Sequence, residues 1–107
     1  MAQPFYATDV DETEQLVHDG MTRLHYGLFT NTGSAIAYVK FWRGSVASVD
    51  PSSDAPLFVI GVPAGATIPA WLGDVECATG CVIGATEEAG IGDTAPDADI
   101  IATVFYN

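Results

Sequence analysis

Basic residues are scarce in this sequence. Arg23, Lys40 and Arg43 stand against fourteen Asp and Glu, which gives a formal net charge of -11. Proteins that bind DNA or RNA draw most of their affinity from Lys and Arg side chains that neutralise phosphates. A chain with this imbalance repels nucleic acid over most of its surface and also keeps its own copies apart. The sequence therefore argues against a nucleic-acid partner.

Long hydrophobic runs are absent as well. A membrane-spanning helix needs about eighteen or more consecutive apolar residues, and no such run occurs in the 107 residues. The opening stretch MAQPFYATDVDETEQ lacks the basic leader and the apolar core of a secretory signal. We therefore expect no membrane partner and no export by the usual signal. With 49% hydrophobic residues, the chain is still too apolar to be a disordered acidic tail.

Ligands for a metal or redox site are few. The two cysteines, Cys77 and Cys81, have the spacing C-x3-C, whereas a redox pair is typically C-x-x-C. A zinc site takes four ligands, and the two histidines, His18 and His25, lie far upstream. Two interpretations of the cysteines stay open. They are small buried residues on neighbouring strands, or they form a disulfide across the intervening turn in an oxidising compartment.

Catalytic signatures are missing too. The serines of the loop 45–56 are not part of a G-x-S-x-G motif. Glu87 and Glu88 are adjacent, so on a strand they point to opposite faces and do not converge on one bond. We expect no enzyme, no cofactor and no metal centre. Calcium binding by the acidic loop stays open, although its spacing differs from the EF-hand pattern; the acids concerned are Asp93, Asp97 and Asp99.

Alternation of apolar and polar residues is what the sequence does contain. In the segment 22–30, TRLHYGLFT, we expect Leu24, Tyr26 and Leu28 on one face of a strand. Arg23, His25 and Phe29 are expected on the other face. A second alternating segment, AIAYVKFW, covers 35–42, and NTGS between the two is typical of a turn. These features together predict a β-hairpin.

Short strands separated by turns continue to the end of the chain. Strands are predicted at 57–62, 74–78, 81–86 and 98–107, with a turn at PAGAT and an acidic Gly-rich loop at 87–97. Six or seven such strands favour an antiparallel β-sandwich, jelly-roll-like or immunoglobulin-like, or a barrel. Residues 16–107 are expected to form this single domain. Residues 1–15 are expected to form an N-terminal arm or an edge strand, because DVDETEQL is too acidic for a core strand.

Aromatic residues supply the candidate interface. Exposed tryptophans stack on sugars or fill a partner's pocket, whereas buried ones anchor a core. For Trp42 and Trp71 we favour core or interface packing. Pro4, Phe5 and Tyr6 form an apolar anchor followed by carboxylates, and we expect this arm to bind a neighbouring subunit. Removing residues 1–15 is then expected to leave the sandwich folded.

Several segments follow one another in a distinctive order: RLHYGLFTNTGSAIAYVKFW, a proline-bounded loop, LFVIGVPAGATIP, WLGDVECATGCVIGAT, an acidic loop and a terminal ATVFYN. This order resembles that of small virion proteins of tailed bacteriophages over residues 20–107. The positions that carry the resemblance are Asn31, Tyr38, Val62 to Gly65, Gly73, Ala78 to Gly80 and Tyr106. The cysteine pair and the pronounced acidity depart from the family pattern.

The resemblance implies a β-sandwich that decorates or cements a phage head and has no catalytic centre. The expected partner is the major capsid protein, with three copies of this chain forming a homotrimer on the shell. The expected location is the outer surface of the capsid, because a charge of -11 is repelled by the DNA inside. The alternative is a carbohydrate-binding module or head-fibre domain that uses Trp71, Trp42 or Tyr26 as stacking platforms.

Overall fold

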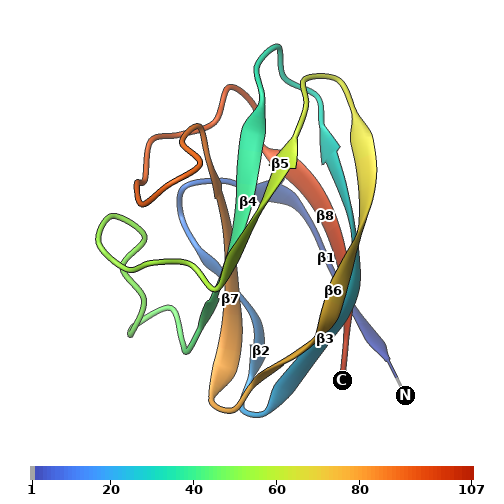
Figure 1. Ribbon diagram of the computed structural model, residues 1–107, viewed down its shortest axis with the longest axis vertical. Coiled ribbons are helices and arrows are strands. Elements are labelled where there is room, and N and C mark those ends of the chain that lie inside the picture. Colours follow the sequence, from blue (N-terminus) through green and yellow to red (C-terminus); the bar gives the residue numbers. More distant parts are fainter. Residues whose placement is uncertain (1) are drawn as a thin grey trace.

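The computed structural model describes residues 2–107 (Figure 1). Over this range the chain forms strands and no helix, so no helix is present that is long and apolar enough to cross a membrane. The strands are β1 (Gln3–Val10), β2 (Gln15–Asp19), β3 (Thr22–Asn31), β4 (Ala37–Arg43), β5 (Phe58–Val62), β6 (Thr67–Cys77), β7 (Gly80–Thr86) and β8 (Ile100–Tyr106).

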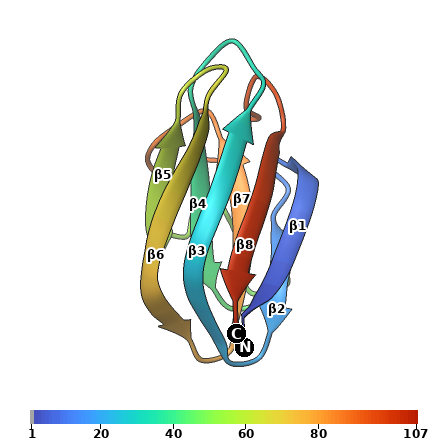
Figure 2. The same ribbon diagram turned by 90° about the vertical axis from the view of Figure 1, so that its right-hand side faces the viewer.

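The strands of residues 2–107 make two four-stranded antiparallel sheets. One sheet has the order β1-β8-β3-β6 and the other has the order β2-β7-β4-β5. The two sheets pack face to face, and both chain ends lie at the same end of the sandwich (Figures 1 and 2). This confirms the predicted all-β sandwich.

The predicted hairpin of β3 and β4 is wrong. β3 pairs with β6 and β8, whereas β4 pairs with β5 and β7 in the other sheet. The segment 32–36 therefore carries the chain from one layer to the other. Asn31 is buried there, and its side-chain amide donates to the carbonyls of Ala35 and Val62 at 2.8 and 2.9 Å. The segment NTGS does connect the two strands, but it makes a crossing between layers and not a hairpin.

The two faces of β3 also differ from the expectation. Leu24 and Phe29 are fully buried, whereas Tyr26 and Leu28 point outward. The register against both neighbouring strands shifts between Leu24 and Tyr26. Because side chains alternate along a strand, one extra residue at this β-bulge moves every later side chain to the opposite face.

The N-terminal segment belongs to the sandwich. β1 pairs with β8 from Gln3↔Tyr106 to Ala7↔Ala102, and after a register shift Val10 pairs with Ile100. Val10 is fully buried, and Val17 of β2 also lies in the core. Of the two possibilities expected for residues 1–15, an arm or an edge strand, residues 3–10 form the edge strand β1, and Val10 supplies a core side chain. Met1 lies outside the described residues.

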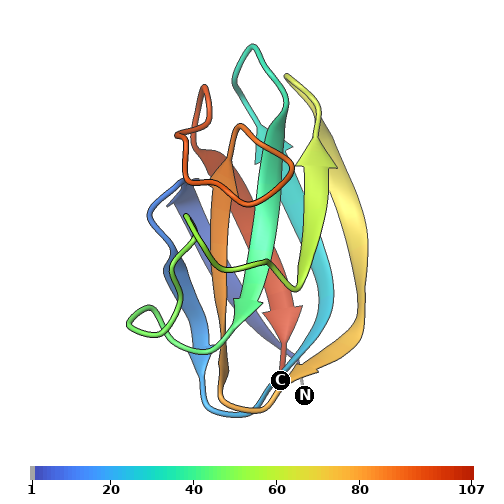
Figure 3. The same cartoon turned by 60° about the vertical axis from the view of Figure 1, so that its left-hand side comes forward.

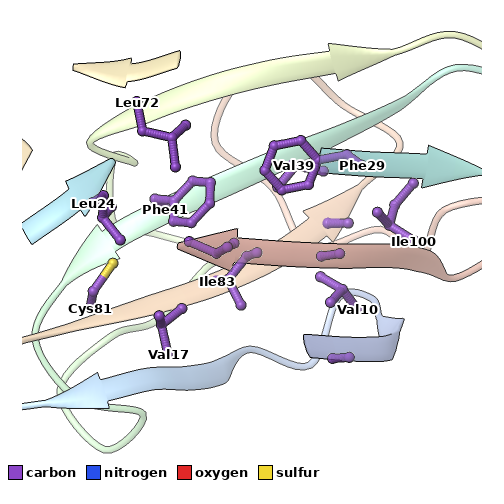
Figure 4. Packing of buried hydrophobic residues seen from close by; sticks show 14 of the residues in the cluster. Val10, Val17, Leu24, Phe29, Val39, Phe41, Leu72, Cys81, Ile83 and Ile100 are labelled. Atoms are coloured by element: carbon purple, nitrogen blue, oxygen red, sulfur yellow. The ribbon is translucent and has the colours of Figure 1, made fainter. Parts of the chain in front are cut away.

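The hydrophobic core lies between the sheets. Phe29 and Phe41 come from opposite sheets and pack edge to face, with ring centroids 6.2 Å apart. Figure 4 shows Val39, Phe41 and Ile83 of one sheet together with Phe29 and Ile100 of the other. Each fully buried aliphatic or phenyl side chain stabilises the fold by roughly 1.5–3 kcal/mol. This core positions the outer face of each sheet.

β6 is longer than the segment predicted at 74–78. It begins at Thr67, directly after the left-handed turn at Gly65 (φ 70°), and contains Pro69. A proline is tolerated here because β6 is an edge strand, where a missing N–H costs no ladder bond. The first half of β6 was not predicted because Pro63, Gly65 and Pro69 are typical of turns.

Candidate binding face

The outward side chains of the sheet β1-β8-β3-β6 line up in rows across the strands. Pro4 of β1 is paired with Phe105 of β8, Phe105 with Tyr26 of β3, and Tyr26 with Trp71 of β6. These four residues form one row. The Tyr26 and Phe105 rings lie 6.5 Å apart between centroids. The view in Figure 2 looks onto this side of the sheet.

Two further rows continue the same surface. The second row contains Tyr6, Thr103, Leu28 and Pro69, and the third contains Ile101, Thr30 and Thr67. The hydroxyls of Thr30 and Thr67 are hydrogen-bonded at 2.8 Å. We call these three rows the aromatic face. Cross-strand neighbours on one face lie about 4.5–5.5 Å apart between Cβ atoms, so the face is continuous.

The aromatic face is exposed and carries no charge. Trp71 is 71% exposed and Tyr6 is 64% exposed, and Tyr26, Leu28 and Phe105 are each between 37% and 41% exposed. None of the eleven residues in the three rows is Asp, Glu, Lys, Arg or His. A contiguous apolar patch rimmed by polar residues marks an interaction site. Here the patch occurs on a chain whose net charge is -11.

Polar pairs close one end of the aromatic face. The β3 bulge places His25 against the carboxylate of Asp74 at 2.5 Å and against the side chain of Asn107. Asp74 has a left-handed backbone (φ 56°), which Asp tolerates better than most residues. The hydrogen bonds to Asp74 and then to Asn107 raise the pKa of His25. Next to this pair, Arg23 binds Glu76 at 2.7 Å.

Uncompensated carboxylates lie at the other end. The pKa of Asp99 is raised first by burial and then by repulsion from Asp11, Asp9 and Glu12. No Lys or Arg forms an ion pair with any of these four acids within residues 2–107. This end of the face is therefore strongly negative.

The outer face of the other sheet is covered over its two central strands, β4 and β7. Trp42 on β4 is only 3% exposed, packs with Val49 and Val82, and donates its indole N–H to the carbonyl of Asp54 at 3.1 Å. Lys40 is fully buried, and its ammonium donates to the carbonyl of Gly90 at 2.5 Å. Burial lowers the pKa of Lys40. The loops 44–57 and 87–99 thus cover β4 and β7 of this sheet, as Figure 3 shows.

The five residues expected at the interface are separated by the fold. Pro4, Tyr6 and Trp71 share the aromatic face, but Phe5 packs against the core and Trp42 lies under a loop on the opposite sheet. Leu28, Pro69 and Phe105 belong to the face and were not expected there. Phe105 lies between two buried residues, Val104 and Tyr106. This alternation along β8 is the one sequence feature that could have placed Phe105 on the outer face.

The cysteines and the acidic loop contribute no metal site. Cys77 and Cys81 are both fully buried and free. The hydrogen bond to Cys77 and then burial raise the pKa of Cys81. Asp97 accepts hydrogen bonds from the backbone N–H and the hydroxyl of Ser34 at 2.6 and 2.9 Å. Within residues 2–107, no three His, Cys, Asp or Glu side chains are placed to hold a metal ion.

Comparison with known proteins adds no assignment. No protein-family model matches the chain, and no curated protein and no solved structure matches it.

Proposed function

We propose that this protein is a structural virion protein without a catalytic centre, which docks through its aromatic face onto the outer surface of a tailed-phage capsid. Its partner is the major capsid protein. The observation that carries the proposal is an uncharged, exposed aromatic face on a chain with net charge -11. The choice of a capsid as the surface rests on the sequence resemblance.

The size of the face indicates how much its rim has to contribute. Four strands about 4.8 Å apart and three rows about 7 Å apart give a flat area of roughly 400 Å². A stable protein interface buries about 800 Å² on each partner. The remaining contacts come from the ends of the face. The acidic end with Asp9, Asp11, Glu12 and Asp99 requires Lys or Arg on the capsid.

Symmetry supplies the rest of the binding strength. A threefold joint of a capsid lattice offers identical sites to three copies of the chain, so the proposed form on the shell is a trimer. Several weak contacts held at one joint bind more tightly than any one of them alone. The acidic surface of each copy opposes association in free solution, particularly at low salt.

The test uses bare capsids of the parent phage. Capsids are mixed with the wild-type protein, with Trp71→Ala and with Tyr26→Ser, sedimented, and assayed for occupancy by gel densitometry. Both variants are expected to lower occupancy at least tenfold near half-saturation. Ile91→Ser is the matched control, because Ile91 is also an exposed apolar side chain but lies in the loop 87–99 on the opposite side. Undiminished occupancy of both face variants contradicts docking through this face.

Carbohydrate binding is the second candidate. The observation that favours it is the exposure of Trp71 beside Tyr26, since flat aromatic side chains stack on sugar rings. If the protein binds carbohydrate, a glycan array is expected to show specific binding that Trp71→Ala abolishes, while the capsid occupancy of this variant is unchanged. Binding to capsids without any glycan signal rejects this candidate.

A further inference from the structure

A groove opens between the two sheets on the side where β5 and β6 are the edge strands. It has a volume of about 610 Å³, and its lining includes Arg43, Phe58, Ile60, Trp71, Leu72 and Val75. Phe58, Ile60 and Val75 are only partly buried and pack against the core. A second hollow of about 470 Å³ shares Arg43 and Leu57 with the groove. Arg43 therefore lies where the two hollows meet.

β5 differs from the other three edge strands of residues 2–107. β1 contains Pro4 and a register shift, β6 contains Pro69 and a register shift, and β2 has a shift within its five residues. β5, with the sequence FVIGV, pairs with β4 in an unbroken register and has neither proline nor charge. Natural edges are usually blunted by such devices, because a flat edge accepts another strand.

Arg43 has an unused cationic group at this edge. Lys40 is buried against backbone carbonyls, and Arg23 is paired with Glu76. The Nε atom of Arg43 donates to the carbonyl of Glu76 at 3.2 Å, and no carboxylate within residues 2–107 pairs with it. On a chain with fourteen acids, this leaves the Arg43 guanidinium free to bind a carboxylate of another molecule.

We infer that β5 and the groove beside it bind an extended peptide segment of a partner protein. The segment adds as a strand to the β5 edge, alternate apolar side chains fill the groove against Phe58 and Ile60, and one carboxylate pairs with Arg43. Pro56 and Pro63 flank the edge, so the added strand spans about five or six residues.

Charge favours a different protein over a second copy of this chain. Pairing β5 with the β5 of another copy brings together two chains of charge -11. The sequence FVIGV offers no carboxylate to Arg43. Trp71 lines the groove and also belongs to the aromatic face. A capsid subunit seated on that face can therefore extend a segment into the groove, and this link alone rests on the proposed function.

The experiment uses the full chain and a displayed library of random seven-residue peptides. Selection is expected to enrich peptides with alternating apolar residues and one Asp or Glu. A synthetic enriched peptide is expected to protect backbone amides of residues 58–62 from hydrogen exchange. Arg43→Gln should weaken its binding at least tenfold, whereas Arg23→Gln, the matched control, should change it less than twofold. Arg43→Glu should prefer the same peptide with Lys in place of the acid.

Three results would overturn the inference. The first is a selection that enriches no peptide, and the second is protection from hydrogen exchange confined to the aromatic face. The third is equal binding of the peptide by Arg43→Gln and the wild-type protein. A dimer in sedimentation whose β5 amides are protected would identify a second copy as the occupant. Peptide binding does not involve Tyr26, so failure of capsid docking and failure of this site are seen in separate assays.

Discussion

The two outer faces of the sandwich differ in how far their side chains are exposed. On the sheet β1-β8-β3-β6 the outward aromatic side chains reach the surface, whereas on the sheet β2-β7-β4-β5 all seven residues of β7 are buried. The difference comes from the connections. Loops of more than ten residues follow β4 and β7 and fold back over their own sheet (Figure 3). Within residues 2–107, no such loop crosses the sheet β1-β8-β3-β6 in the view of Figure 2.

Specific hydrogen bonds hold the covering loops in place. The Lys40 ammonium and the Trp42 indole reach loop carbonyls, and Glu88 accepts the backbone N–H of Thr94 at 2.8 Å. The outward side chains of β4, Lys40 and Trp42, are therefore buried because the loops 87–99 and 44–57 hydrogen-bond to them. The aromatic face has no such cover within residues 2–107, and its side chains stay exposed.

The two tryptophans give the sharpest test of this comparison. Trp42→Ala is expected to lower the free energy of unfolding by about 3–5 kcal/mol, because it leaves a cavity under the loop. Trp71→Ala is expected to change it by less than about 0.5 kcal/mol, since the side chain is mostly in solvent. Urea unfolding followed by circular dichroism measures both. Equal losses would show that the faces do not differ in this way.

The same comparison of buried and exposed side chains applies to the two faces of β1. Val10→Ala is expected to cost about 2–3 kcal/mol, from lost burial and a small cavity. Tyr6→Ala is expected to have little effect, because Tyr6 lies on the aromatic face. The same unfolding assay applies. If Val10→Ala were neutral, residues 1–10 would be an arm that the core does not need.

Gly27 tests the buried side of β3. An added Cβ at Gly27 would lie 2.4 Å from the Cζ atom of Phe29, so the Phe29 ring has to move within a filled core. Gly27→Ala is expected to cost about 1–3 kcal/mol. Gly90→Ala is the control, because nothing lies within 4 Å of its added Cβ. A neutral Gly27→Ala variant would mean that Phe29 has space to shift.

The smallest expected effect is a change in the pKa of His25, which lies at the rim of the aromatic face. Its folded-state pKa is raised above 6.5 by hydrogen bonds to Asp74 and Asn107, so Asp74→Asn is expected to lower it in an NMR titration. A raised pKa means that the folded state holds the proton more tightly. The stability from this site is therefore fully present below about pH 6.5 and is lost as the pH rises through the folded-state pKa. An unchanged titration in Asp74→Asn contradicts this assignment.

Local patterns identified β4, β5, β7 and β8 with boundaries close to those observed. They missed β2, which has five residues beside an acidic turn, and the first half of β6, which contains Pro69. Of the five residues expected at the interface, Pro4, Tyr6 and Trp71 lie on the aromatic face. Phe5 packs against the core and Trp42 lies under a loop on the other sheet, and the local pattern of an aromatic residue does not tell which way its ring points.

The sequence by itself determined the all-β class, the acidic surface and the absence of a recognisable catalytic motif, because alternation, charge and motif spacing are local properties. Only the tertiary structure decided which strands share a sheet and which side chains share a face. The bulge at His25 reverses every later position of β3, and the choice between a hairpin and a crossing after Asn31 depends on distant partners in β6 and β8. Those partners are selected by burial in one common core, which no local stretch of the chain specifies alone.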